Sequence, residues 1–143
     1  MPTRKEGWEA ALSDYLLRAA AVPFSYGRQD CGLFVAGAIE VMTGLDVIPQ
    51  LRGRYSGRRE AFAAIQALCG KPTMEAVSTY LAGIYGFPEV PVSFARRGDP
   101  VQLRQGRRAS LGIVAMYGTE LLTPFGGGLL RLPLSHATRA WRV

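Results

Sequence analysis

One cysteine stands where a loop turns into an apolar helix, in the stretch YGRQDCGLFV at positions 26–35. Asp30 directly precedes Cys31, and Gly32 follows it and leaves room for a substrate backbone. The unpaired N–H groups and the positive end of a helix dipole favour the thiolate over the thiol. The same N–H groups can hold an oxyanion. The stretch therefore indicates a nucleophilic Cys31, with Asp30 and Gly32 at the helix start.

A thiol nucleophile also needs a base within hydrogen-bond reach and a group that orients this base. The chain has one histidine, His136, in the polar segment 135–138. We take His136 as a candidate base, and a surface histidine is the alternative. Cys31 is either a reactive thiol with a lowered pKa or a packed cysteine inherited with its fold. Asp30 likewise has two interpretations: it is either a helix cap or a functional group.

The cysteine and histidine content argues against other chemistries. Two cysteines, Cys31 and Cys69, are too few for a disulfide framework, and they do not form a Cys-x-x-Cys motif. A structural zinc site is not expected with one histidine. Cys69 lies near the end of a helical apolar pattern, so we interpret it as a small buried side chain. We expect neither a metal nor a cofactor.

The formal net charge of +6 comes almost entirely from arginine. Arginine contacts phosphate and carboxylate and is common at protein interfaces, although a GC-rich genome gives the same bias. Aromatic residues do not interleave with the arginine clusters as in a nucleic-acid-binding module. A solvated or protein-facing basic surface is therefore expected, and a nucleic-acid partner is an alternative that rests on charge alone. We expect no membrane span and no signal peptide.

The apolar pattern divides the chain into a helical and a strand-like half. Helices are expected over 8–19, 31–42, 59–68 and from Thr73 to Gly86. Short strands are expected over 92–95, 101–103, 110–117, 120–125, 129–134 and 140–143, the last one at a sheet edge. Helices followed by an antiparallel sheet make an α+β domain. We expect one domain over 1–143, helical over about 8–86 and sheet over about 92–143.

The cysteine motif resembles that of a known enzyme group. Asp30-Cys31-Gly32 at the head of a helix is similar to the nucleophile motif of the NlpC-type cell-wall cysteine peptidases, which are papain-like and usually have Asp-Cys-Ser-Gly. RGDPV at 97–101 resembles their Gly-Asp turn into the first barrel strand, and SLGIV at 110–114 resembles their second strand. The resemblance implies N-terminal helices packed on an antiparallel sheet or half-barrel. It also implies that Cys31 attacks peptide bonds of peptidoglycan.

A narrower resemblance covers most of the chain. Tyr-Gly-x-x-Asp-Cys, Gly53-Arg54-Tyr55 and a terminal Ala-Trp-Arg are similar to small tail-tip proteins of tailed bacteriophages and gene-transfer particles. This resemblance implies a virion protein that is made in the host cytoplasm and acts at the host cell envelope. Its partners would be other tail-tip or hub proteins, and peptidoglycan. The Arg-rich loop 46–59 and an exposed Trp141 would dock the neighbouring tail proteins.

The chain departs from the peptidase pattern where the base should be. Ser110 stands at the position of the family's catalytic histidine, and serine is not a general base near neutral pH. The third polar position would fall near Thr123. The sequence thus predicts a tail-tip component with a peptidase-like fold and without the catalytic histidine. The alternative is an active peptidase or amidase in which Cys31 attacks and His136, or a group from a partner, is the base.

Overall fold

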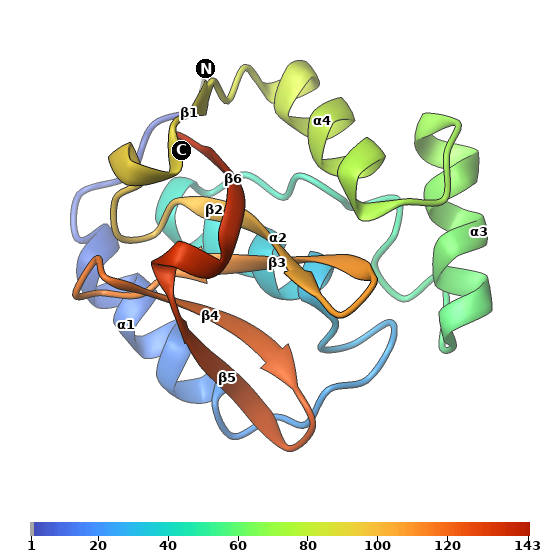
Figure 1. The fold of residues 1–143 in the computed structure, drawn as a ribbon, viewed down its shortest axis with the longest axis horizontal. Coiled ribbons are helices and arrows are strands. Elements are labelled where there is room, and N and C mark those ends of the chain that lie inside the picture. The colour runs from blue at the N-terminus through green and yellow to red at the C-terminus, as the bar shows by residue number, and fades with distance from the viewer. Residues whose placement is uncertain (1) are drawn as a thin grey trace.

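Four helices precede a six-stranded sheet in the computed structural model, which describes residues 2–143 (Figure 1). The helices are α1 (Trp8–Ala19), α2 (Cys31–Thr43), α3 (Arg58–Cys69) and α4 (Met74–Tyr85). The last three each end at a glycine with positive φ: Gly44, Gly70 and Gly86. Glycine adopts this left-handed C-cap without the steric cost that other residues meet. The predicted α+β class and the four predicted helices are confirmed.

The sheet is antiparallel throughout and has the strand order β1-β6-β2-β3-β4-β5. Its strands are β1 (Glu89–Val90), β2 (Pro100–Gln105), β3 (Arg108–Val114), β4 (Glu120–Phe125), β5 (Gly128–Pro133) and β6 (Ala137–Trp141). Two short 3₁₀ helices, η1 (Val92–Phe94) and η2 (Leu134–His136), precede β2 and β6. The hairpin predicted around Gly126 to Gly128 joins β4 and β5.

Two strand predictions are wrong. The segment 92–95 forms η1, because Phe94 and Ala95 donate their N–H groups to carbonyls three residues earlier and leave them unavailable to a strand partner. The C-terminal strand is not at an edge, because β6 lies between β1 and β2. β1 has two residues, which is too short to give an alternating pattern in the sequence.

The helices and the sheet share their main core on one face of the sheet. Leu12 of α1, Phe34 and Met42 of α2, and Ile113 of β3 belong to this buried cluster. Figure 1 shows α1 and α2 behind the strands, with α3 and α4 set to one side. Neighbouring strand residues point to opposite faces, so Val114 belongs to a second, smaller cluster on the other face. Within residues 2–143, each helix is too short or too polar to cross a membrane.

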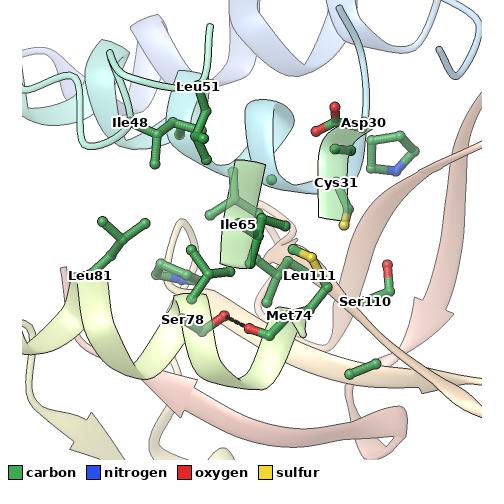
Figure 2. Close-up of a pocket in the computed structure, with 18 of the residues that line it drawn as sticks. Asp30, Cys31, Ile48, Leu51, Ile65, Met74, Ser78, Leu81, Ser110 and Leu111 are labelled. Carbon is green, nitrogen blue, oxygen red and sulfur yellow. Dashed lines mark hydrogen bonds between the residues drawn. The ribbon is translucent and has the colours of Figure 1, made fainter. Parts of the chain in front are cut away.

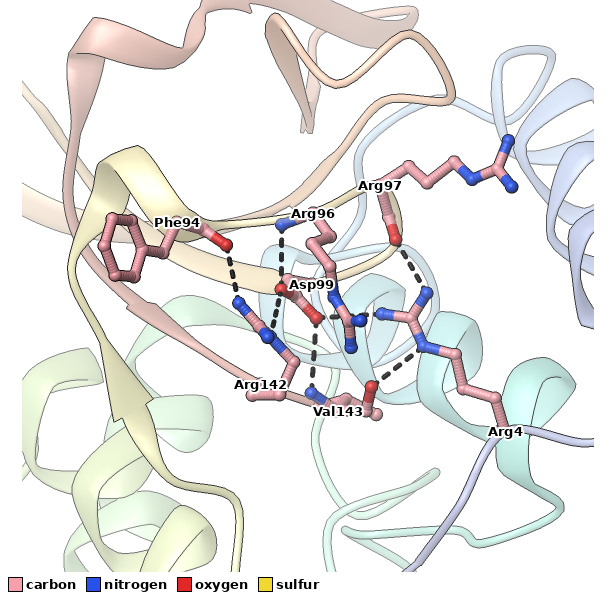
Figure 3. Close-up of polar contacts among 7 residues, drawn as sticks. All are labelled: Arg4, Phe94, Arg96, Arg97, Asp99, Arg142 and Val143. Carbon is pink, nitrogen blue, oxygen red and sulfur yellow. Dashed lines mark hydrogen bonds and ion pairs between the residues drawn. The ribbon is translucent and has the colours of Figure 1, made fainter.

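A buried carboxylate ties both ends of the chain to the sheet (Figure 3). Asp99 is fully buried, and its Oδ1 lies 2.8 Å from Nη2 of Arg4, while its Oδ2 lies 3.2 Å from Nε of Arg142. The N–H groups of Arg96 and Val143 also donate to Asp99. Burial lowers the pKa of Arg4, and the charge of Asp99 opposes this shift. The Gly-Asp turn and the terminal Ala-Trp-Arg are therefore parts of one structural cluster.

Candidate functional site

Asp30 organises the start of α2. Its Oδ1 accepts the N–H of Leu33 at 2.9 Å, which is the contact of a helix N-cap, so the predicted capping role is confirmed. Its Oδ2 accepts the N–H of Gly27 at 3.0 Å and the hydroxyl of Tyr55 at 2.6 Å. Burial, together with the hydrogen bond to Asp30, raises the pKa of Tyr55, so the phenol stays protonated and donates. Asp30 thus joins three segments and fixes the position of the next residue, Cys31.

The environment of Cys31 favours the thiol. Cys31 is half-buried, and the desolvation of its thiol is the main cause that raises its pKa above the ordinary value of 9.0. The negative charge of Asp30 adds to this shift. Hydrogen bonding from the Ser110 side chain and from the backbone of Leu111 and Gly32 acts in the opposite direction but is smaller. The lowered pKa expected of a reactive nucleophile is therefore not found. A helix N-terminus favours a thiolate, but here a carboxylate already occupies that helix end.

Two hydroxyl side chains, on the neighbouring strands β3 and β4, lie on the sheet side of the thiol. Ser110 of β3 lies beside Cys31, and its Oγ is 3.5 Å from Oγ1 of Thr123 on β4. That distance is longer than an ordinary O–H···O hydrogen bond, and Thr123 donates instead to the carbonyl of Leu111 at 2.8 Å. Cys31, Ser110 and Thr123 lie on α2, β3 and β4 in turn. Neither hydroxyl can take up a proton near neutral pH, so the arrangement holds the thiol without activating it.

The structure does not bring His136 to this site. His136 is exposed at the end of η2, and it is not among the residues that line the cavity at Cys31. The expected exposure of Trp141 is wrong. Trp141 is 4 % exposed and belongs to the main core, because β6 lies inside the sheet, and the Arg139 guanidinium covers its ring at 4.7 Å. Trp141 therefore does not offer a docking surface.

Cys31 opens onto a cavity of about 500 Å³ between α2, α3, α4 and β3. Figure 2 shows the sulfur pointing into this space near Ser110, with Ile65 and Leu81 across the cavity. The lining is mostly apolar, and Tyr26 and Tyr55 belong to it. Sequence reasoning missed the cavity, because the packing of α3 and α4 against α2 depends on contacts that helix periodicity does not specify.

The remaining cysteine and the acidic residues do not form a second site. Cys69 donates to the carbonyl of Ile65 at 3.3 Å and is half-buried near the end of α3. Across residues 2–143, His, Cys, Asp and Glu do not gather in any group of three or more that could hold a metal ion.

Comparison with models of known protein families gives a match. A family model described as "Domain of unknown function (DUF6950)" matches residues 3–143, which is nearly the whole chain. No curated protein matches the sequence. Since the description of this model carries no activity, the function has to be argued from the site.

Proposed function

We propose that this chain, which belongs to the DUF6950 family, is a tail-tip component of a tailed bacteriophage that has a peptidase-like site without peptidase activity. The observation that carries the proposal is the pair formed by Cys31 at the start of α2 and Ser110 on β3. In the peptidase resemblance these two positions belong to the thiol nucleophile and to its base, and here a serine stands in place of the base. The protein would act at the distal tail during wall penetration, as part of the virion.

The motif positions support an NlpC-type, papain-like ancestry. Cys31 is the first residue of α2, and the Gly98-Asp99 turn leads directly into β2. Ser110 and Thr123 follow on β3 and β4. This order of helix, turn and strands is the order in which the resemblance places the nucleophile, the turn, the base and the third polar group.

Chemistry argues against hydrolysis by the isolated chain. Amide cleavage needs a base that takes the thiol proton and an acid that protonates the leaving amine. A thiol whose pKa is raised by burial is present as thiolate in only a small fraction near neutral pH. Ser110 beside the thiol, and Thr123 next to Ser110, cannot perform either proton transfer.

A tail-tip subunit without catalytic activity would contribute surfaces that bind other tail proteins. The Arg-rich loop 46–59 offers part of such a binding surface. Within this loop, Arg52 already forms ion pairs with Asp46 at 2.9 Å and with Glu40 at 3.3 Å. Arg54 and Arg59 are exposed, and the ion pairs of residues 2–143 do not include them. Arginine is enriched at protein interfaces, so these two side chains are the candidates for contacts with other tail-tip or hub proteins.

One observation favours the alternative of an active peptidase or amidase. Cys31 faces a cavity that can hold a ligand, which an inherited but unused thiol does not require. In that case a partner subunit would have to supply the base, since Ser110 and the exposed His136 do not. Peptidoglycan peptides would then be the substrate.

The test uses particles that carry the Cys31→Ala substitution. We expect them to assemble, and to infect within about twofold of the wild type, because the thiol does not perform chemistry; Cys69→Ala is the matched control. The purified protein should release no soluble peptides from isolated cell walls. Particles with Cys31→Ala that assemble normally but stop at the wall would overturn the proposal in favour of the active enzyme.

A further inference from the structure

The cavity beside Cys31 has the size and lining of a ligand site. Its volume of about 500 Å³ lies within the range of about 300–1,000 Å³ that is usual for small-molecule pockets. Ile39 of α2, Ile65 of α3, and Val77 and Leu81 of α4 contribute to its walls. Protein interiors are otherwise close-packed, and water finds few hydrogen-bond partners in an apolar space. An apolar chain is therefore the occupant that these walls fit.

A second, smaller cavity of about 250 Å³ adjoins the first and is basic. The two cavities share Phe62, Met74, Arg108 and Ala109 in their walls. We call Arg58, Arg107 and Arg108 the basic vestibule; all three are exposed and line the smaller cavity, together with one acidic residue, Glu75. The seven ion pairs found within residues 2–143 do not involve any of the three arginines.

The positive charge of the basic vestibule favours a ligand whose second end is anionic. Three guanidinium groups against one carboxylate leave an excess of positive charge where the apolar cavity meets the smaller one. Arginine binds carboxylate and phosphate oxygens through paired N–H donors. Because Arg108 lines both cavities, a ligand whose apolar chain fills the larger one can place an anionic head at the basic vestibule.

We propose that the two cavities bind a free single-chain anionic amphiphile. Its chain occupies the space next to Cys31, and its carboxylate or phosphate head lies at the basic vestibule. This inference goes beyond the proposed function and does not depend on it, since it needs no reaction at the thiol. The site lies between helices and a strand rather than on a flat face, which favours a monomeric amphiphile over a membrane surface.

Calorimetric titration of the purified full chain with dodecanoate, used below its micelle concentration, tests the proposal. We expect saturable binding that weakens at least about tenfold in the Arg107→Glu/Arg108→Glu double variant, because two favourable charge contacts become repulsive. Arg18→Glu is the matched control, since Arg18 is exposed on α1 and lines neither cavity; the affinity of this variant should stay within about twofold. Dodecyltrimethylammonium, which has the same chain and a cationic head, should not bind.

A second measurement locates the chain without relying on a variant. Cys31 lines the larger cavity and Cys69 does not, so bound dodecanoate should slow the alkylation of Cys31 and leave that of Cys69 unchanged. Absence of saturable binding, equal binding of the cationic analogue, or unprotected Cys31 would each overturn the proposal. Binding only to anionic phospholipid vesicles would overturn it in favour of a membrane surface. These outcomes are distinguishable from those of the infection and cell-wall assays, which measure the proposed function.

Discussion

The side chains of Cys31 and Ser110 face each other between the start of α2 and β3 (Figure 2). Burial raises the pKa of Cys31, and hydrogen bonding from Ser110 opposes the shift only in part. The serine hydroxyl therefore contacts the thiol without lowering its pKa below the ordinary value.

The burial of Cys31 should make stability fall at alkaline pH. Its folded-state pKa is raised above 9.0, so the folded chain keeps a proton that the unfolded chain loses. This contribution is fully present below the unfolded pKa and is lost as the pH rises through the folded pKa. Between pH 8 and pH 10, we expect the free energy of unfolding in urea to decrease more for the wild type than for Cys31→Ala, by roughly 1 kcal/mol. Equal decreases in the two proteins would contradict the raised pKa, and Cys69→Ala is the control.

Removing the hydroxyl of Tyr55 should loosen the start of α2. Tyr55→Phe deletes the 2.6 Å hydrogen bond to the buried Asp30 carboxylate, and we expect a loss of about 1.5–3 kcal/mol in the free energy of unfolding. Tyr117→Phe is the matched control, because Tyr117 is 86 % exposed. The two losses are measured by urea denaturation under the same conditions. A loss for Tyr55→Phe no larger than for the control would mean that this hydrogen bond does not hold Asp30.

Neutralising Asp99 should cost at least as much stability as removing the Tyr55 hydroxyl, because two arginines lose their buried partner. We expect Asp99→Asn to lower the free energy of unfolding by about 3 kcal/mol. This value is the lower end of the usual cost of breaking a buried ion pair, because Arg4 and Arg142 keep some exposure to solvent. Glu120→Gln removes the exposed pair with Arg131 and should cost at most about 1 kcal/mol. Thermal unfolding of the two variants compares the effects. Similar losses would show that Asp99 does not tie the chain ends to the sheet.

The sequence predicts the elements near Cys31 well because their signals are local. Asp30 as a cap and Gly44 as a helix end follow from neighbouring residues, and the placement of Cys31 on a helix and of Ser110 on a strand follows from pattern. The order of strands is a long-range property, so neither the interior position of β6 nor the burial of Trp141 could be predicted.

Two further features of the site depend on contacts between distant segments. The cavity arises where α3 and α4 meet α2 without filling the space between them. The direction of the Cys31 pKa shift depends on burial by β3 and on the carboxylate of Asp30. Helix-start position alone predicts the opposite direction, which shows that a capping residue and its packing have to be known before a thiol is judged reactive.

If Ser110 stands where a catalytic base is missing, then Ser110→His should activate Cys31. The measurement is the rate at which iodoacetamide alkylates Cys31 as a function of pH, in the wild type and in Ser110→His, with His136→Ala as the control. We predict slow alkylation of the wild type near neutral pH that increases only toward alkaline pH, and no change in His136→Ala. In Ser110→His the rate at neutral pH should increase at least about tenfold, with a lower apparent pKa, because an adjacent imidazolium stabilises the thiolate. Fast alkylation of the wild type at neutral pH, or an unchanged rate in Ser110→His, would contradict the account.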